Sequence, residues 1–210
     1  MRKNLYGIMI KYPEPGNVKT RLAKDVGNNR AAEIYRQVTD LIMTNTAPAD
    51  QGYDRIVLYD PPERFHDFEQ WLPENHLILQ QGNDVGERMD NAITELLAHG
   101  AEKVVLTGAD IPALNSAIIA KAFATLDHAD IVIGPAADGG YYLIGMKEPH
   151  GEIFYGIPWS SGEVLKQTVR VIEGQKLQYQ SLITLSDLDT ASDYERFLTQ
   201  EPPLIPGRSS

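Results

Sequence analysis

The sequence contains no cysteine, which excludes disulfide bonds, thiolate nucleophiles and cysteine-ligated metal centres. It also has no run of about 18 consecutive apolar residues, the length that a helix needs to cross a bilayer, so we expect no membrane span. The amino terminus lacks the charged, apolar and small-residue succession of a signal peptide. These absences together predict a cytoplasmic protein.

Common catalytic signatures are missing as well. The loop after the first apolar run matches neither the G-x-x-x-x-G-K-[ST] phosphate loop nor the G-x-G-x-x-G dinucleotide fingerprint, which disfavours ATPases and dehydrogenases. The five histidines have no metal-ligand spacing and no serine partner for a hydrolytic triad. D-L-D-T at 187–190 resembles a phosphatase motif, but Ala191 stands at its fifth position and the motif lies at the wrong end of the chain.

Positive charge is scarce and unevenly placed. The chain has 19 Lys and Arg against 29 Asp and Glu, a net charge of -10. Residues 1–36 hold eight of the basic residues and three of the acidic ones, so that segment carries +5 and the remainder -15. One basic focus in an acidic chain suits a phosphorylated small molecule better than a nucleic acid. We therefore expect the opening segment to bind an anion.

Strand and helix patterns alternate along the 210 residues. This length fits one domain, expected over 1–200, followed by a flexible tail at 201–210. The predicted strands lie at 5–12, 55–60, 76–81, 103–110 and 130–136, and the predicted helices at 31–42, 65–72, 88–100 and 116–126. Such alternation predicts an α/β fold, a three-layer α/β/α sandwich with a mainly parallel sheet. Ligands of these sheets bind beyond the carboxyl ends of the strands.

The loop after the first predicted strand, K-Y-P-E-P-G-N-V-K-T-R-L-A at 11–23, holds the basic focus. Lys11, Lys19 and Arg21 are its cations, Gly16 permits a turn, and Thr20 lies near the start of the next helix. An ammonium and a guanidinium beside backbone amides of a helix start can bind phosphate. The alternative is that these are solvated surface charges, but their position after the first strand favours phosphate binding.

Two acidic motifs follow later strands. In T-G-A-D-I-P, Asp110 comes directly after a strand, where it could bind Mg²⁺ or instead cap a turn. In G-P-A-A-D-G-G-Y-Y, Asp138, Gly139 and Gly140 lie between two apolar runs, so a ligand could approach the backbone closely. The alternative there is an Asp-Gly hairpin turn, which can coexist with binding.

A third acidic cluster lies near the carboxyl terminus, with Asp187, Asp189 and Asp193 close together. Like charges at this spacing repel one another unless a cation or water screens them. One interpretation makes Asp187 or Asp189 a metal ligand. The other is a helix start, with Thr190 or Ser192 as its cap and Asp193 near the positive end of the helix dipole.

Two further motifs mark helix starts. Arg88 lies in the first turn after G-N-D-V-G-E, and Trp159 and Ser160 precede a helix in G-I-P-W-S-S-G-E. Trp159 is more often a core residue than a ligand platform.

Together these motifs, with D-L-D-T, occur in one order across nearly the whole chain. The sequence resembles a bacterial family of predicted glycosyltransferases in the nucleotide-diphospho-sugar transferase superfamily, and its layout is similar to that of small guanylyltransferases of cofactor biosynthesis. The resemblance implies a GT-A fold with a mixed sheet. It also implies a nucleotide or nucleotide sugar and a small-molecule acceptor as ligands, with Mg²⁺ or Mn²⁺ as the cofactor.

The resemblance also implies roles for single residues. Asp110, Asp138 and Lys19 would be catalytic, and Asp110 with Asp187 or Asp189 would hold the metal. The remaining roles are phosphate or nucleotide binding for Lys11, Gly16, Lys19, Thr20, Arg21 and Arg88, and sugar or acceptor binding for Asp138, Gly139, Gly140, Trp159 and Ser160.

Three functions remain open at this point. The family resemblance favours a metal-dependent glycosyltransferase that uses a nucleotide diphosphate sugar. The basic pair Lys19 and Arg21, placed where pyrophosphate would leave in the guanylyltransferases, favours a nucleotidyltransferase. A non-catalytic nucleotide or sugar sensor is a third hypothesis, disfavoured because it would not need the carboxylates.

Overall fold

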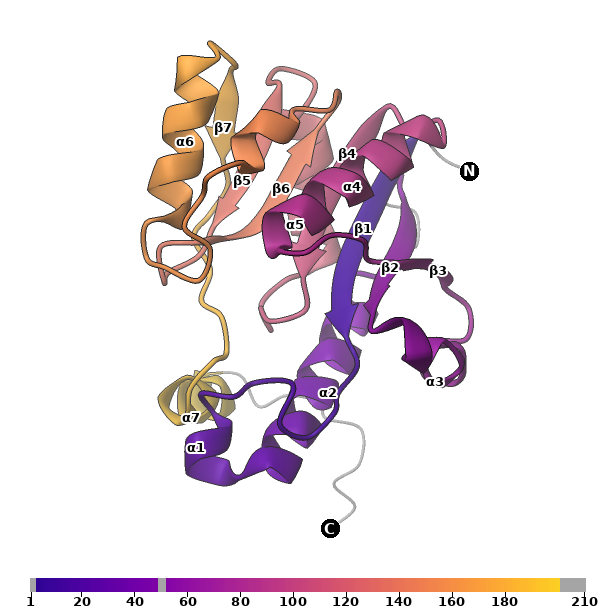
Figure 1. Ribbon diagram of the computed structural model, residues 1–210, viewed down its shortest axis with the longest axis vertical. Helices are drawn as coiled ribbons and strands as arrows, with labels where there is room; N and C mark the ends of the chain where they lie inside the picture. The colour runs from indigo at the N-terminus through magenta and orange to yellow at the C-terminus, as the bar shows by residue number, and fades with distance from the viewer. Residues whose placement is uncertain (1–2, 49–51, 201–210) are drawn as a thin grey trace.

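The computed structural model describes residues 3–48 and 52–200, which form one sheet covered by helices (Figure 1). The tail expected over 201–210 lies outside the described residues. The strands are β1 (Asn4–Lys11), β2 (Asp54–Asp60), β3 (His76–Leu79), β4 (Lys103–Gly108), β5 (Ile131–Pro135), β6 (Tyr141–Met146) and β7 (Tyr179–Ser181). The helices are α1 (Ala23–Val26), α2 (Asn28–Asn45), α3 (Phe65–Trp71), α4 (Val85–Ala98), α5 (Ser116–Thr125), α6 (Val164–Gly174) and α7 (Ala191–Gln200), with short 3-10 turns η1 (Pro62–Arg64) and η2 (Gly151–Phe154).

The sheet has the strand order β3-β2-β1-β4-β6-β5-β7. The pairs β3–β2, β2–β1, β1–β4 and β5–β7 are parallel, whereas β6 is antiparallel to both of its neighbours. The sheet is therefore mixed and mainly parallel, as predicted. Because β1, β2 and β4 run in one direction, their carboxyl ends meet at one edge.

Side chains from both faces of the sheet are buried, which explains why β1 reads as a nearly continuous apolar run. Tyr6, Ile8 and Ile10 contribute to a core cluster with residues of α2, α3 and α5. Leu5 belongs to the opposite cluster, which includes residues of α4, η2 and α6. The two cores on opposite faces confirm the predicted α/β/α sandwich.

The segment between β1 and the first long helix differs from the sequence-based expectation. Only a single helical turn, α1, follows the basic loop, and Gly27 then adopts a φ of 83° before α2 begins at Asn28. A left-handed φ interrupts a helix, and glycine adopts it without steric cost. Thr20 therefore lies near the start of the short helix α1, and the predicted helix at 31–42 lies within the longer α2.

After β7 an extended segment, residues 182–190, leads to α7 (Figure 1). Leu185 forms a parallel bridge with Ala136, just beyond β5. Arg30 of α2 donates a hydrogen bond to the Tyr194 hydroxyl of α7 at 3.3 Å, which joins the two helices. Among the described residues, no helix is both long and apolar enough to cross a membrane.

Candidate functional site

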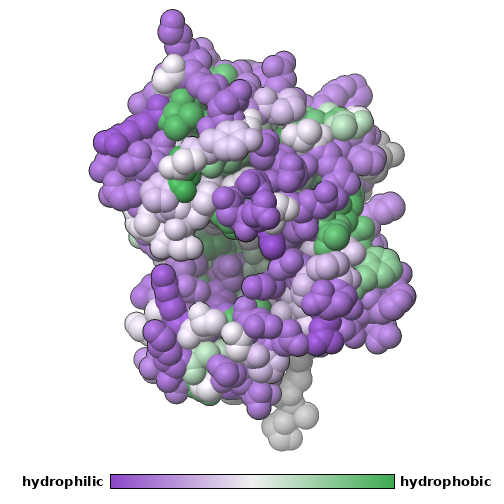
Figure 2. Space-filling model, in the orientation of Figure 1, coloured by the Kyte–Doolittle hydropathy of each residue, from purple (hydrophilic) through white to green (hydrophobic). Residues whose placement is uncertain are grey.

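Two adjoining cavities lie at the carboxyl edge of the sheet, and Figure 2 shows this side of the molecule hollowed. The first cavity, of about 530 Å³, is lined by residues of β1, β2, β4, β6 and α4, and the second, of about 370 Å³, extends toward residues 187–189. Asp110, Asp138 and Ser160 line both. The two cavities are therefore halves of one cleft, and this is the edge where ligands of such sheets bind.

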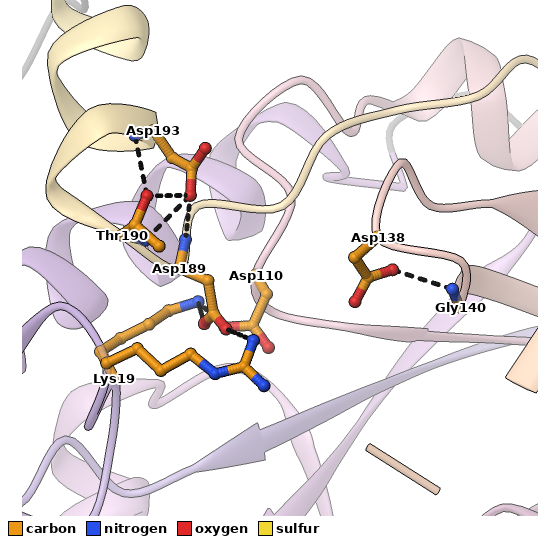
Figure 3. Close-up of polar contacts among 8 residues, drawn as sticks. Lys19, Asp110, Asp138, Gly140, Asp189, Thr190 and Asp193 are labelled. Atoms are coloured by element: carbon orange, nitrogen blue, oxygen red, sulfur yellow. Dashed lines mark hydrogen bonds and ion pairs between the residues drawn. The ribbon is translucent and has the colours of Figure 1, made fainter. Parts of the chain in front are cut away.

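Lys19 and Asp110, 91 positions apart in the sequence, meet beside this cleft (Figure 3). The Lys19 ammonium lies 2.5 Å from Asp110 Oδ1 and 3.3 Å from Asp189 Oδ1. The Lys19 side chain is only 3% exposed and lines neither cavity. The predicted basic loop thus reaches the predicted metal ligands, and its buried lysine neutralises them.

The electrostatics of Lys19 follow from this enclosure. Burial by itself lowers the pKa of Lys19, but the charges and hydrogen bonds of Asp110 and Asp189 outweigh it, so the pKa lies above the usual lysine value. The ammonium therefore stays charged at neutral pH. Its backbone φ is 47°, a left-handed conformation that is uncommon outside glycine and is often found at functional sites.

Asp110 stands at the end of β4, where the chain leaves the sheet. Its carboxylate is about half exposed and faces both cavities. The buried Tyr35 of α2 lies nearby, and burial together with the charge of Asp110 raises the pKa of Tyr35. The Tyr35 hydroxyl accepts a hydrogen bond from the backbone N–H of Lys11 at 3.1 Å, which joins α2 to the end of β1.

Asp138 lies in the turn between β5 and β6, on the other side of the cleft from Lys19 (Figure 3). Its Oδ1 accepts a hydrogen bond from the backbone N–H of Gly140 at 2.8 Å. The predicted hairpin turn is confirmed, and the same aspartate lines both cavities. The turn and a carboxylate that lines the cleft therefore coexist.

The segment 182–190 brings two further carboxylates to the second cavity. Leu188 is buried and its N–H donates to the carbonyl of Asp110 at 3.0 Å, so the flanking Asp187 and Asp189 both line the cavity. Asp189 accepts from Lys19 and from Arg21 at 3.3 and 3.4 Å. Burial, followed by the charge of Asp138, raises the pKa of Asp187.

Asp193 belongs to a helix start, as one interpretation of the acidic cluster held. Its Oδ2 accepts hydrogen bonds from the backbone N–H groups of Asp189 and Thr190 and from the Thr190 hydroxyl, at 3.2, 2.9 and 2.6 Å. The N–H of Asp193 donates to the Thr190 hydroxyl at 3.2 Å. This reciprocal pair is a capping arrangement at the start of α7. Asp193 does not line the second cavity.

The first cavity is lined by both polar and aromatic side chains. Arg88, on the first turn of α4, lies 3.1 Å from Asp60 Oδ2 and donates to the carbonyl of Gly82. Trp159 lines the same cavity and packs so closely on Gly86 that a Cβ at that glycine would lie 2.6 Å from the indole ring. The Trp159 ring therefore acts both as packing and as cavity wall.

The structure separates the predicted residues into two groups. Those that line the cleft are Lys11, Arg21, Arg88, Asp110, Asp138, Gly140, Trp159, Ser160, Asp187 and Asp189. Gly16, Lys19, Thr20 and Gly139 do not line it. Gly139 instead faces the backbone of Gly162, where a Cβ would lie 2.2 Å from the carbonyl oxygen.

Sequence reasoning did not single out Asp60, Gln80 and Tyr35, all of which line the first cavity. Asp60 is the last residue of β2, which pairs with β1, and Gln80 directly follows β3, which pairs with β2. Position at a strand end was the available signal, and it applied to these residues as it did to Asp110. Tyr35 had no comparable signal because it lies within an ordinary helical repeat.

The described residues contain no group of three or more His, Asp or Glu side chains arranged to hold a metal ion. Two carboxylates do converge, since Asp110 and Asp189 both contact one ammonium group. Magnesium is usually held by one or two carboxylates, with substrate phosphates and water as further ligands. The donor set therefore fits such an ion, and does not form a metal cage made of protein alone.

Residues 43–161, more than half of the chain, match the family described as "Uncharacterized protein conserved in bacteria (DUF2064)". The chain belongs to this family. The matched part of this DUF2064 protein includes Asp110 and Asp138 but not Lys19, Asp187 or Asp189. A comparison with curated proteins finds no match.

Solved structures extend the likeness to the whole DUF2064 chain. A crystal structure described as a "putative nucleotide-diphospho-sugar transferase" from Desulfovibrio desulfuricans G20 is 36% identical, with a TM-score of 0.91, covering 100% of this chain and 92% of the other. The fold of this DUF2064 protein is thus the GT-A type of nucleotide-diphospho-sugar transferases, as the resemblance implied.

More distant structures share the fold alone. CMP:2-keto-3-deoxy-manno-octonic acid synthetase complexed with CTP is 11% identical, with a TM-score of 0.53 and coverage of 92% of this chain and 96% of the other. Glucosyl-3-phosphoglycerate synthase from Mycobacterium tuberculosis, in complex with Mn²⁺, UDP and glucosyl-3-phosphoglycerate, is 10% identical, with a TM-score of 0.54 and coverage of 93% and 75%. This DUF2064 protein therefore shares its fold with both nucleotidyltransferases and sugar transferases.

Proposed function

We propose that the chain is a divalent-metal-dependent glycosyltransferase that moves a sugar from a nucleotide diphosphate sugar to a small-molecule acceptor. The observation that carries this proposal is the meeting of Lys19 with Asp110 and Asp189 at the carboxyl edge of the sheet. Cations and carboxylates at one point are what a metal-bridged diphosphate requires. The full-length relative at 36% identity supports sugar transfer as the reaction.

The first cavity suits the nucleoside. Trp159 supplies an aromatic surface, and Asp60 and Gln80 supply hydrogen-bonding groups beside it. Small-molecule sites typically combine an apolar wall with a few polar groups that fix orientation. Lys11, at the end of β1, adds a cation at the margin of the same cavity.

The second cavity suits the phosphates, the metal and the acceptor. Asp110, with Asp187 or Asp189, would hold Mg²⁺ or Mn²⁺, because carboxylate oxygens are the ligands that these ions prefer. When bound, the ion would offset the negative charge that develops on the leaving diphosphate. Arg21 is 61% exposed and lines this cavity, so its guanidinium is available for a direct phosphate contact.

Asp138 is the proposed base. One of its oxygens accepts from Gly140, which orients the carboxylate, and the other is available to a ligand in the cleft. An acceptor hydroxyl bound beside it would transfer its proton to Asp138 as the new bond to the sugar forms. Gly140 also lines both cavities, so the backbone there can approach the ligand closely.

A nucleotidyltransferase is the second candidate. Lys19 and Arg21 both contact Asp189, and a basic pair in this loop would help to neutralise a pyrophosphate leaving group, which supports this reaction. In it, a nucleoside triphosphate would react with a sugar or cofactor phosphate and release pyrophosphate. A sensor without catalysis would not need Asp110, Asp138, Asp187 and Asp189 around one cavity.

Product analysis separates the candidates. The protein is incubated with Mn²⁺ and each of a panel of nucleotide sugars, and separately with nucleoside triphosphates and sugar phosphates, and the products are separated by ion exchange. We expect slow release of nucleoside diphosphate from one sugar donor even without an acceptor. Pyrophosphate alone would establish the second candidate in its place, and no product from either class would favour the sensor.

The variant Asp110→Asn tests the proposed metal site directly. This change removes a charge at the cleft, and Asp189 still pairs with the buried Lys19, so we expect a folded protein in thermal unfolding and loss of metal-assisted nucleotide binding in titration calorimetry. Binding of nucleotide and metal equal to that of the parent protein would show that the metal ligands are elsewhere.

A further inference from the structure

Two segments that are distant in the sequence meet through one aspartate beside the second cavity. Lys19 and Arg21 belong to the loop after β1, and Asp189 belongs to the segment before α7. Asp189 Oδ1 accepts from Lys19 and Asp189 Oδ2 accepts from Arg21, at 3.3 and 3.4 Å. Both oxygens of this carboxylate therefore face the basic loop.

The backbone of Asp189 is itself held from the carboxyl-terminal side. Its N–H donates to Asp193 Oδ2 at 3.2 Å, and the neighbouring N–H of Thr190 donates to the same oxygen at 2.9 Å. The Thr190 hydroxyl closes the arrangement by donating to Asp193 at 2.6 Å and accepting from the Asp193 N–H at 3.2 Å. One carboxylate thus fixes two successive peptide groups, the first of which carries the Asp189 side chain.

A second anchor lies on the other side of Asp189. Leu188 is buried in the core and donates its N–H to the carbonyl of Asp110. The backbone of Asp189 is thus held on both sides, by the hydrogen bond of Leu188 and by the capping pair, so it has little freedom to move. The start of α7 therefore does more than begin a helix, because the bonds that cap the helix also fix the partner of the basic loop.

We propose that Thr190 and Asp193 are positioning residues of the site: they fix Asp189, and through Asp189 they hold Lys19 beside the second cavity and Arg21 at its wall. This inference rests on the proposed function only in taking Arg21, which lines that cavity, to bind phosphate. Asp193 contacts no ligand in this arrangement, and Asp189 acts by holding the cations.

Inorganic pyrophosphate is the binding probe, measured by titration calorimetry without any nucleotide. Arg21→Ala removes a cation that lines the cavity, so its loss of pyrophosphate affinity is the reference for losing a phosphate contact. We expect Asp193→Ala and Thr190→Val to raise the Kd for pyrophosphate about fivefold. This fold-change is equivalent to the free energy of one lost capping hydrogen bond. Thr190→Ser keeps the hydroxyl and should bind as the parent does.

The matched control is Tyr194→Phe. It removes the hydrogen bond between α7 and Arg30 without touching the cap, so it should leave pyrophosphate binding unchanged. Hydrogen exchange of residues 17–22 gives a readout without ligand: Asp193→Ala should accelerate exchange there, and Tyr194→Phe should not.

The outcomes separate the two proposals. If Asp193→Ala affects exchange only within α7 and binds pyrophosphate as Tyr194→Phe does, the cap serves the helix alone and the positioning role is wrong. If the parent protein binds neither pyrophosphate nor nucleotide, the proposed function fails. Hydrogen exchange in residues 17–22 then decides the positioning role by itself.

Discussion

Lys19 shows how a single residue can link strain, burial and charge. Its backbone has a left-handed φ of 47°, and its ammonium contacts both Asp110 and Asp189. Such a conformation costs of the order of 1–3 kcal/mol in a non-glycine residue. Two ion pairs to a side chain that is 3% exposed offset that cost. The same ion pairs keep three charged groups together at the edge of the cleft.

Asp138 gives a test of catalysis that is separate from binding. In Asp138→Asn the amide oxygen can still accept from Gly140, so the turn is retained while the proposed base is lost. We expect turnover to fall about a hundredfold, the contribution typical of a general base, with nucleotide affinity little changed. Steady-state kinetics and titration calorimetry measure the two quantities. An equal loss of affinity would assign Asp138 to nucleotide binding.

Asp187 predicts a dependence of stability on pH. Burial and the charges of Asp138 and Asp189 raise its folded-state pKa above the unfolded value, so the ionised carboxylate destabilises the fold. The penalty begins as pH rises through the unfolded pKa and is complete above the folded pKa. Asp187→Asn should therefore be more stable than the parent at pH 7, and thermal unfolding should show the difference vanish at pH values below the unfolded pKa.

The control for this series is Asp25→Asn, which removes the same charge from an exposed position on α1. Its stability difference from the parent should not follow the pattern of Asp187→Asn. Destabilisation by Asp187→Asn at pH 7 would mean that the ionised carboxylate has a partner that outweighs its neighbours.

At the scale of elements, the turn between β5 and β6 is locked to the loop before α6. Gly139 has a φ of 91°, and its N–H and carbonyl bond to Ala136 and Leu165. A Cβ there would also lie 2.2 Å from the carbonyl oxygen of Gly162. Two independent constraints, backbone conformation and contact, therefore require glycine at this position.

Gly139→Ala should destabilise the protein by about 2 kcal/mol or more, because the residue meets both strain and a backbone clash. Urea denaturation measures the loss. Gly100→Ala is the matched control, since Gly100 has a φ of 93° but no atom within 4 Å of an added Cβ. Equal losses for the two variants would show that the contact with Gly162 is not tight.

At the scale of the whole molecule, two cations, Lys19 and Arg21, lie where acidic side chains cluster at the edge of the sheet. A net charge of -10 and a cleft lined by four aspartates around the second cavity would repel a phosphorylated ligand without compensating cations. Lys19 and Arg21 supply part of that compensation, and a divalent ion would supply more. Metal and nucleotide should therefore assist one another.

A thermal shift assay tests this cooperation. A ligand at a hundredfold its Kd stabilises the folded state by about 2.7 kcal/mol. In a protein of this size that corresponds to a rise in Tm of roughly 5–10 °C. We expect a nucleoside diphosphate with Mn²⁺ to raise the Tm more than the sum of the two alone, and strict additivity would contradict the shared site.

Much of the fold was predictable because the information is local. The apolar runs at 55–60 and 103–110 became β2 and β4, and the helical repeats at 65–72 and 116–126 became α3 and α5, with ends shifted by at most two residues. Chain order then placed Asp110 and the basic loop at strand ends. Thr190 and Asp193 could be recognised as a helix start because capping is a contact between near neighbours in sequence.

The sequence by itself thus determined the element order, the α/β class and which residues stand at strand ends. Only the tertiary structure decided that Lys19 is enclosed between Asp110 and Asp189, that Arg88 pairs with Asp60, and that Gly139 faces Gly162 and not the cleft. The physical reason is the sequence separation over which each kind of interaction acts. Hydrophobic period and capping act over a few residues, whereas ion pairs between residues up to 170 positions apart depend on how the strands order and how the loops cross the sheet edge.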